Sequence, residues 1–472
     1  MLSGTAMNVW TAFNTLQLVQ NELLIFALFW FVIGMFDELA VDLTWLGLRL
    51  AGKGGAGHMP DALAGAPLAG MQAVFIPAWQ EAAVIGATVA QMLAVWPQAQ
   101  LRIYVGCYGN DAATVAAAMA GAGHDPRIRV VIHERAGPTT KADCLNRLYA
   151  AMLADESRLG CRYRGVILHD AEDMVHPAEL VAIDRAMDRN AFVQLPVRPE
   201  PQAASPWVAG HYCDEFTEAH AKAMVVRDAL GAAIPAAGVG CGFARDTLGA
   251  LAVMRQAEGE AGPFAAECLT EDYELGVLVA RTGGTSHFLR LRDARGQLVA
   301  TRSYFPAEFG NAVRQKTRWI HGIAFQGWER LGWSGRAVDV WMALRDRRGP
   351  MTALVLTAGY VLMLMEGVLH LANLAGWYAP PPLHPGVELM LAVSFCGLIW
   401  RAGLRFAFTA REYGLAEGLL AVSRIPVANM VAIFASRRAF QAYFRSLRGG
   451  LVVWEKTVHD LHPALAAGRV AP

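Results

Sequence analysis

Three carboxylates follow a short apolar run near the middle of the sequence. Residues 166–168 read as the end of a β-strand, and Asp170, Glu172 and Asp173 come almost directly after it. Open α/β sheets bind ligands at the carboxyl ends of their strands, and carboxylate oxygens suit Mg²⁺ or Mn²⁺ better than Zn²⁺. The stretch predicts a divalent-cation site. The same acids could instead cap the helix that follows, and on these residues alone the two interpretations are about even.

Strand-like and helical stretches alternate from residue 71 onward. We expect strands at 71–76, 101–106, 128–133, 166–168 and 191–197, and helices at 82–96, 114–120, 141–153 and 207–230. This alternation is typical of a mostly parallel sheet with helices on both faces. Because such a sheet brings the loops after its strands to one edge, polar residues in those loops are expected to share one site.

Two later stretches carry further candidate residues. The glycine-rich run 238–242 matches neither a P-loop nor the Rossmann spacing, so close approach of the backbone to a substrate or to another strand explains it better than phosphate binding does. Thr270, Glu271 and Asp272 open a predicted helix, with Thr270 placed as its N-cap. Helix capping is the plainest role for Thr270 and Glu271.

The composition indicates a membrane protein. Of 472 residues, 54% are hydrophobic and 17% are charged, and the mean hydropathy is +0.29. These values are too apolar for an ordinary soluble chain of this length. Basic and acidic residues number 41 each, which removes the electrostatic argument for a nucleic-acid partner. The seven scattered cysteines contain no Cys-x-x-Cys pair and are expected to be reduced cytoplasmic thiols, neither zinc ligands nor a disulfide frame.

Several segments are expected to contact the membrane. The apolar run 23–36 reaches spanning length when extended back to residue 16, and the first basic residues of the chain, Arg49 and Lys53, follow it. The positive-inside rule therefore puts the amino terminus outside and the next domain in the cytoplasm. Further spans are expected at about 351–377 and 387–408, with interfacial helices at about 414–448.

A basic, Trp-containing stretch precedes these later spans. Residues 314–348 hold eight Lys or Arg against three acids, which is typical of an amphipathic element on a lipid surface. The expected organisation is an N-terminal transmembrane helix with its cytoplasmic entry (1–50), a linker (51–70), an α/β domain with an acceptor-side amphipathic helix (71–335), and a C-terminal membrane region with a short tail (336–472).

Four stretches, in this order, together resemble a membrane-embedded family 2 glycosyltransferase with the GT-A fold. They are a first strand and loop at 75–81, an Asp-x-Asp position at 170–172, an acceptor-base motif at 270–272, and Gln-x-x-Arg-Trp at 315–319. The resemblance covers roughly 72–333. It implies a Rossmann-like cytoplasmic domain with a mostly parallel sheet, joined to α-helical transmembrane and interfacial segments.

Within that family, the run 169–173 and the stretch 318–323 resemble the phage adsorption protein B group of bacterial inner-membrane proteins. Some family features differ. Gln80 stands where the family usually has Asn, and Asp111 follows the second strand without the earlier Asp that commonly faces the nucleotide base. Glu172 replaces the second Asp of the metal motif, so Asp173 could share or take over the metal.

The resemblance implies an inverting transferase that uses a nucleoside-diphosphate sugar, expected to be UDP-linked, with Mg²⁺ or Mn²⁺ as cofactor. Asp272 is the candidate general base, and the candidate metal ligands are Asp170, Glu172 and Asp173. The candidate donor-binding residues are Glu81, Asp111, Lys141 and Asp170. The candidates for the acceptor or the diphosphate are Glu271, Gln315, Arg318 and Trp319, with Arg318 on the diphosphate and Trp319 stacked on a sugar. For Lys141, a solvated surface position is nearly as good an explanation.

The expected function is elongation of a polysaccharide at the bacterial inner membrane by a multi-pass protein with a cytoplasmic catalytic domain. Its partners would be the nucleotide-sugar donor, a glycan or lipid-linked acceptor, membrane lipids and an outer-membrane export partner. One alternative is a transferase that adds a single sugar to polyprenyl phosphate. Another is a non-catalytic membrane scaffold for export or phage binding, although three spans provide little wall for a pore.

Overall fold

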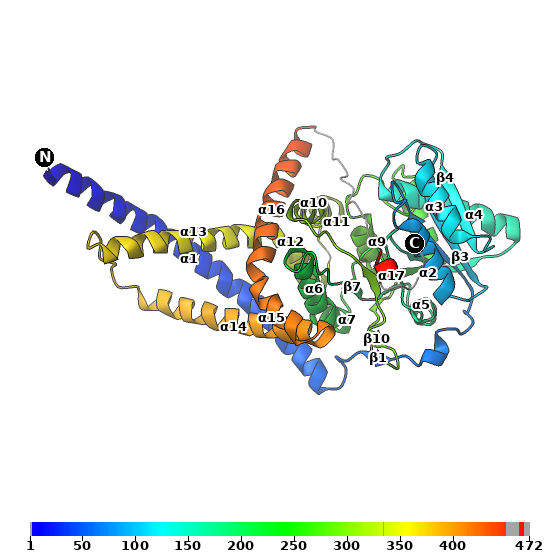
Figure 1. Ribbon diagram of the computed structural model, residues 1–472, viewed down its shortest axis with the longest axis horizontal. Coiled ribbons are helices and arrows are strands. Elements are labelled where there is room, and N and C mark those ends of the chain that lie inside the picture. The colour runs from blue at the N-terminus through cyan, green and yellow to red at the C-terminus, as the bar shows by residue number, and fades with distance from the viewer. Residues whose placement is uncertain (1, 334, 450–461, 467–472) are drawn as a thin grey trace.

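The computed structural model describes residues 2–333, 335–449 and 462–466. Long helices extend from one end of the molecule, and an α/β domain forms the other (Figure 1). The predicted tail beyond residue 449 lies outside the described residues except for α17 and the residue before it.

The helices are α1 (Leu2–Leu50), η1 (Asp61–Leu63), α2 (Ile85–Val95), α3 (Ala112–Ala122), α4 (Lys141–Leu159), α5 (Glu179–Ala186), α6 (Val208–Glu218), η2 (Ala219–Ala223), α7 (Met224–Ala229), α8 (Arg245–Gln256), α9 (Glu271–Arg281), α10 (Phe309–Ile320), η3 (His321–Gln326), α11 (Gly327–Leu331), α12 (Ala337–Arg347), α13 (Gly349–Leu374), α14 (Pro385–Tyr413), α15 (Leu415–Ser423), α16 (Ile425–Leu447) and α17 (Pro463–Ala466). The helix expected at 207–230 contains the π-helical segment η2 between α6 and α7.

The strands are β1 (Gly57–His58), β2 (Met71–Pro77), β3 (Leu101–Tyr108), β4 (Ile128–His133), β5 (Tyr163–Leu168), β6 (Phe192–Gln194), β7 (Val197–Pro199), β8 (Cys241–Ala244), β9 (Ser286–Phe288), β10 (Leu291–Arg292) and β11 (Thr301–Ser303). Seven of them form the central sheet in the order β4-β3-β2-β5-β8-β6-β9. Neighbouring strands are parallel except where β8 pairs with β5 and β6. The predicted mostly parallel sheet is confirmed.

Two hydrophobic layers cover the sheet because successive strand residues point to opposite faces. In β2, Val74 and Ile76 belong to the core beneath α2, α3 and α5, whereas Ala73 and Phe75 belong to the core beneath α4, α8 and α9. A strand buried on both faces is apolar at nearly every position, which explains the apolar run from Ala73 to Ile76. The polar exception in β2, Gln72, is buried and donates a hydrogen bond to Asp184.

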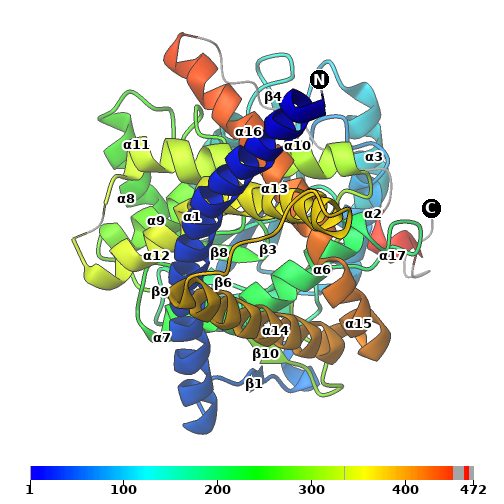
Figure 2. The same cartoon turned by 90° about the vertical axis from the view of Figure 1, so that its left-hand side faces the viewer.

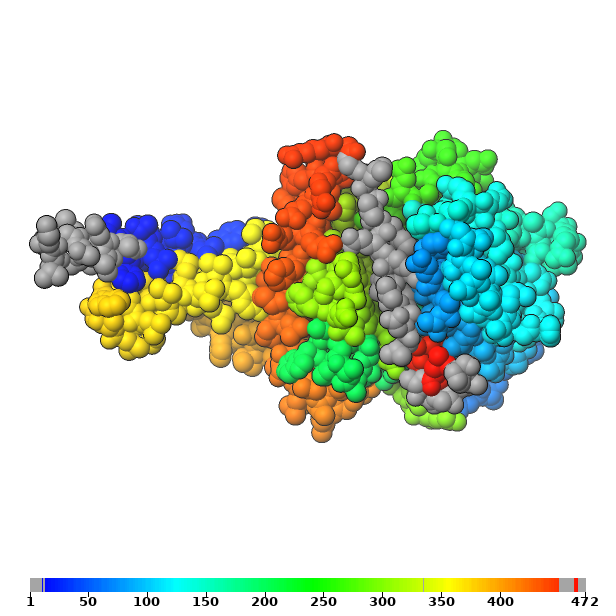
Figure 3. All heavy atoms as spheres, turned by 45° about the horizontal axis from the view of Figure 1, so that its top comes forward, coloured from blue at the N-terminus to red at the C-terminus, as the bar shows by residue number. Residues whose placement is uncertain are grey.

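Three helices in the described part of the chain are long and apolar enough to cross a membrane. They are α1 from Phe13 to Leu50, α13 and α14. Helices α15 and α16 meet at a bend of 50° and could together form a fourth, broken span or a re-entrant loop. Figure 2 shows α1, α13 and α14 extending toward the viewer, and Figure 3 shows the narrow extension beside the bulkier α/β domain.

Ion pairs join the spanning helices to the α/β domain. Lys222 in η2 is 2% exposed, and its Nζ lies 2.6 Å from Asp42 Oδ1 of α1 and 2.9 Å from Glu218 Oε1 of α6. Glu38, one turn earlier in α1, pairs with Arg401 of α14 at 2.5 Å and with Arg345 of α12 at 3.0 Å. These bonds hold α1 against elements from distant parts of the chain.

We predict that Lys222→Met lowers the stability of the protein. Removing one member of a buried ion pair leaves Asp42 and Glu218 without their shared cation, which costs about 3–5 kcal/mol. The thermal unfolding midpoint of the full chain in detergent measures the effect. Exposed Lys53→Met serves as the control, and equal midpoints for the two variants would contradict the prediction.

Candidate functional site

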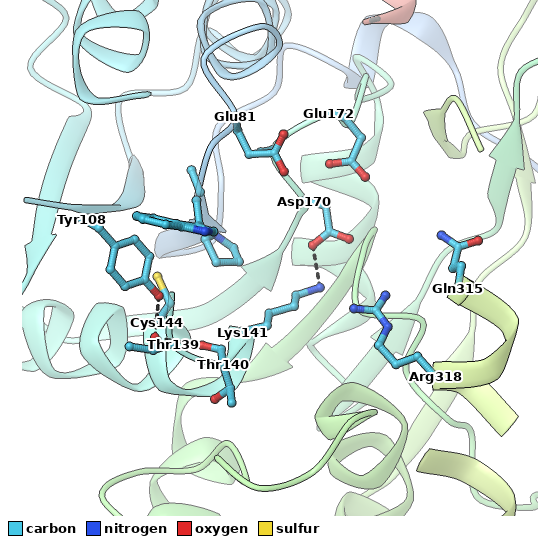
Figure 4. Close-up of a pocket in the computed structure, with 14 residues that line it drawn as sticks. Glu81, Tyr108, Thr139, Thr140, Lys141, Cys144, Asp170, Glu172, Gln315 and Arg318 are labelled. Atoms are coloured by element: carbon cyan, nitrogen blue, oxygen red, sulfur yellow. Dashed lines mark hydrogen bonds and ion pairs between the residues drawn. The ribbon is translucent and has the colours of Figure 1, made fainter. Parts of the chain in front are cut away.

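An open cavity with an empty volume of about 670 Å³ lies at the carboxyl edge of the sheet (Figure 4). The loops after β2, β3, β4 and β5 form one side of it, because parallel strands end at the same edge. Helix α10 supplies the other side with Gln315 and Arg318. The site therefore combines sheet loops with a helix that is distant in sequence.

Lys141 is the cationic centre of this cavity. It is the first residue of α4, where Thr140 caps the helix by accepting a hydrogen bond from Asp143 N. Its Nζ lies 2.5 Å from Asp170 Oδ1, and only 14% of its side chain is exposed. Burial lowers the pKa of Lys141, but the charges of Asp170, Glu271 and Asp272 outweigh burial and raise that pKa above its ordinary value. Lys141 is therefore a charged site residue and not a solvated surface lysine.

Glu271, which is buried, and Asp272, which is half-buried, lie in the first turn of α9. Burial raises the pKa of Asp272, whereas Lys141 and Arg318 act to lower it. Burial, followed by the charge of Asp272, raises the pKa of Glu271 to about 8. The pair therefore holds its protons to a higher pH than two exposed carboxyl groups would.

Gly238 explains the glycine-rich run. Its φ is +76°, and a Cβ atom there would lie 2.2 Å from Asp272 Oδ2 and 3.2 Å from Lys141 Nζ. Gly240, with φ +57°, similarly packs against Thr301, where a Cβ would lie 2.2 Å from Oγ1. Only glycine accepts both the backbone conformation and the contact. The backbone thus approaches side chains of the site itself.

Asp170 and Glu172 line the cavity, and their oxygens are chemically suited to Mg²⁺ or Mn²⁺. No group of three or more His, Cys, Asp or Glu side chains among the described residues is arranged to hold a metal ion. Mg²⁺ is commonly held by one or two carboxylates together with water and substrate phosphates, so two carboxylates beside an open cavity fit such an ion.

Asp173 is placed differently from its prediction as a metal ligand. It is 1% exposed, and its Oδ2 accepts a hydrogen bond from Asp170 N at 3.0 Å and lies 3.0 Å from His169 Nδ1. The other ring nitrogen of His169 lies 3.1 Å from Glu179 Oε1. Burial lowers the pKa of His169, but Glu179 and Asp173 outweigh it and raise the pKa to about 9. Asp173 therefore stabilises, through these hydrogen bonds, the loop that carries Asp170.

Asp111 also lies outside the residues that line the cavity. It caps α3, and its Oδ2 accepts a hydrogen bond from Gln80 N at 2.6 Å. Gln80 has a φ of +54°, a rare conformation for a residue other than glycine. Asp111 thus stabilises the turn that presents Trp79 and Glu81 to the cavity.

Helix α10 divides the predicted acceptor residues between two environments. Gln315 and Arg318 line the cavity, and Gln315 Oε1 is buried without a hydrogen-bond partner in the described chain. Trp319 instead packs in an aromatic cluster with Tyr212, 6.2 Å between ring centroids, and Phe305, 6.5 Å away. The structure does not place Trp319 where it could stack on a sugar in the cavity.

Two aromatic residues of the cavity were not singled out from the sequence. Trp79 and Tyr108 pack edge to face, with ring centroids 5.1 Å apart, and Tyr108 Oη lies 2.6 Å from Thr139 Oγ1. Their signal was their position: one follows β2 and the other ends β3, both at the ligand-binding edge.

Thr270 precedes α9 as expected, but its side chain makes no capping hydrogen bond. Its hydroxyl is buried without a partner among the described residues, and a Cβ added to Gly322 would lie 2.4 Å from Oγ1. Thr270 therefore packs against η3 in place of capping.

The family described as "Glycosyltransferase like family 2" matches residues 69–322, more than half of the sequence. The chain belongs to this family. Membership agrees with the predicted GT-A class and identifies the protein as a glycosyltransferase.

Bacteriophage adsorption protein B of Escherichia coli K12 is 33% identical across 82% of this chain and 54% of its own length. Bacteriophage N4 adsorption protein B of Escherichia coli O157:H7 gives the same values. The chain spans about half the length of these curated relatives.

Solved structures are similar at lower identity. A mannosyltransferase from Pyrobaculum calidifontis in complex with GDP-Man and Mn²⁺ is 16% identical, with a TM-score of 0.49 over 85% of this chain and 99% of that one. Glucosyl-3-phosphoglycerate synthase from Mycobacterium tuberculosis in complex with Mn²⁺, UDP and phosphoglyceric acid is 19% identical, with a TM-score of 0.29 over 48% and 69%.

We predict that Gly238→Ala reduces glycosyl transfer by about tenfold or more, because the new methyl group would displace Asp272 or Lys141. Gly259→Ala is a matched control. Gly259 also has a positive φ of +88°, but a Cβ there would meet nothing within 4 Å. Both variants should lose similar stability from backbone strain, about 1 kcal/mol. Equal transfer rates in the two variants would contradict the assignment.

Proposed function

We propose that this glycosyltransferase transfers a sugar from a nucleoside-diphosphate donor, UDP-linked, to the hydroxyl of a growing polysaccharide, with inversion at the anomeric carbon. The observation that carries the proposal is that Asp272 lies close to Lys141, which pairs with Asp170, and that Lys141 and Asp170 both line the cavity. A cation beside carboxylates suits a diphosphate that must be bound and then released.

The donor half of the cavity would be formed by the sheet loops. Trp79 and Tyr108 offer aromatic surfaces to a nucleobase. Asp170 and Glu172 would hold Mg²⁺ or Mn²⁺, which when bound would neutralise charge on the diphosphate. Glu81 reaches toward the same two carboxylates in Figure 4 and is placed to contact the donor. Lys141 and Arg318 supply the cations that this chain itself contributes.

Asp272 would act as the general base. The acceptor oxygen attacks the anomeric carbon while the bond from that carbon to the diphosphate oxygen breaks, and the electron pair leaves with the diphosphate. The acceptor proton passes to the Asp272 carboxylate. Inversion follows because attack and departure occur on opposite faces of the sugar. A raised pKa makes Asp272 a stronger base than an exposed carboxylate.

Helix α10 would receive the acceptor through Gln315 and Arg318. It packs against α16, which in turn packs against the candidate span α13. That position suits a growing or lipid-linked acceptor at the cytoplasmic face of a bacterial inner membrane. An outer-membrane export partner, expected from the resemblance alone, stays a prediction.

We predict that Asp272→Asn slows release of nucleoside diphosphate by about 10²- to 10⁴-fold while donor binding is retained, because the variant lacks the proton acceptor. The assay uses the full chain in detergent with a panel of UDP- and GDP-sugars and Mg²⁺ or Mn²⁺. Asp246→Asn, whose carboxylate is 81% exposed, is the control.

Full turnover by Asp272→Asn would refute the catalytic assignment. In the same assay, product length separates elongation from transfer of a single sugar to polyprenyl phosphate. A series of lengthening products is expected, and a single-sugar product would favour the second activity.

The pH dependence follows from the raised pKa of Asp272. The base must be ionised, so kcat/KM should rise with pH and reach half its maximum clearly above 3.8, the ordinary pKa of this carboxyl group. Steady-state rates measured across a range of pH with the preferred donor give this rise in kcat/KM. A half-maximum near pH 4 would show that the surroundings of Asp272 do not raise its pKa during turnover.

A further inference from the structure

A second cavity, with an empty volume of about 920 Å³, lies away from the sheet edge. Its walls come from α7, α9 and α12 and from Trp333, Gly335 and Arg336, which precede α12. Figure 2 shows α9, α11 and α12 on the same side of the molecule. None of the residues assigned to sugar transfer lines this cavity.

Positive charge dominates the second cavity. Four guanidinium groups line it, those of Arg227, Arg281, Arg336 and Arg347. Two carboxylates offset them: Asp339, which lies 3.3 Å from Arg336 Nε, and Asp346, which accepts two hydrogen bonds of 2.9 Å from Arg227. Among the described residues that line the cavity, two positive charges are therefore left without a matching carboxylate.

Two of the arginines sit inside the cavity and two at its rim. Arg227 and Arg347 are 6% and 8% exposed, whereas 59% of the Arg336 side chain is exposed and Arg281 is also exposed. Arg347 donates to the carbonyls of Gly327 and Gly332 at 2.8 Å. Its Nε is buried and has no acceptor within the described chain. A buried, unpaired charged donor is costly unless an anion satisfies it.

Exposed aromatic side chains lie beside the second cavity. The Arg347 guanidinium lies over the Trp333 ring, 4.9 Å from its centroid, and Trp333 packs edge to face with Trp328 at 4.9 Å. The two indoles are 41% and 56% exposed. Helix α13, a candidate span, begins two residues after α12 ends. Exposed Trp beside the start of a span is typical of a membrane interface.

We propose that this cavity binds a phosphate-bearing anion, with the headgroup of an anionic phospholipid as its source. Paired guanidinium groups bind phosphate oxygens by charge-assisted hydrogen bonds. An arginine inside the cavity, such as Arg347, and one at its rim, such as Arg281, would bind the same phosphate from two sides. The indole of Trp333 would contact the glycerol region of the same lipid. This site lies beyond the proposed transfer reaction.

An occupant would also contact the helix that carries the candidate base. Tyr273 lines this cavity and follows Asp272 directly in α9. Tyr273 Oη donates a hydrogen bond of 2.7 Å to Asp346, the same carboxylate that binds Arg227. An anion bound at the arginines would therefore change the contacts of Asp346, and through its hydrogen bond to Tyr273 it would affect the first turn of α9.

Binding to the full chain in detergent, followed by native mass spectrometry, tests the proposal. The probes are phosphatidylglycerol, zwitterionic phosphatidylcholine and soluble glycerol 3-phosphate. The variant Arg281→Gln with Arg336→Gln removes the two rim charges. Arg295→Gln removes an exposed arginine outside the cavity and is the matched control. Thermal unfolding midpoints verify folding, and Arg336→Gln alone replaces the double variant if that variant is unstable.

We expect phosphatidylglycerol to bind more tightly than phosphatidylcholine, and the double variant to weaken that binding by about tenfold while Arg295→Gln does not. Binding of glycerol 3-phosphate that the double variant weakens, without preference between the lipids, would support the anion site and assign it a soluble ligand. Equal binding of both lipids without glycerol 3-phosphate binding, or equal weakening by Arg295→Gln, would overturn the proposal. These readouts need no transfer activity, so their failure is separate from failure of the proposed function.

Discussion

One buried ammonium group holds together carboxylates from separate parts of the chain. Lys141 pairs with Asp170 after β5 and lies within the electrostatic reach of Glu271 and Asp272 in α9. Without this cation, the negative charges of three neighbouring acids, of which Glu271 is buried, would repel one another with less compensation. The start of α4, the end of β5, the first turn of α9 and the bare backbone of Gly238 all meet at that charge. The geometry proposed for transfer depends on their staying there.

A similar constraint operates where the membrane helices meet the α/β domain. Helix α1 carries Glu38 and Asp42 into the interface with the α/β domain, and these acids are paired with Arg401, Arg345 and Lys222. Buried ion pairs of this kind add little net stability over apolar packing, but breaking one is expensive. These ion pairs mainly fix position, because they hold α1, α12 and α14 in one arrangement beside the α/β domain. Helix α10, which brings Arg318 to the cavity, packs against α16 within that arrangement.

One helix lies beside both cavities. The first turn of α9 brings Asp272 close to Lys141, which lines the transfer cavity, and the same helix lines the arginine-rich cavity with Tyr273, Val277, Ala280 and Arg281. These four positions recur at helical spacing and share a face, whereas Asp272 is turned about 100° from Tyr273. A single short helix can thus carry a residue for chemistry and a wall for a ligand at the membrane side.

The sequence by itself determined the sheet, the family and the segments that can span a membrane. Apolar strand-like runs, their alternation with helical stretches, and charge patterns are local properties, so they can be recognised in the amino-acid sequence. Only the tertiary structure decided which polar side chains share the cavity. The carboxylates of Asp173 and Asp111 accept hydrogen bonds from backbone N–H groups. Trp319 packs in an aromatic cluster, whereas Trp79 and Tyr108 line the cavity. A motif specifies residue types along the chain, but the direction of a side chain depends on helical phase and on neighbours distant in sequence. For the same reason the second cavity has no sequence signature, because its arginines come from three helices and a turn that meet only in the folded molecule.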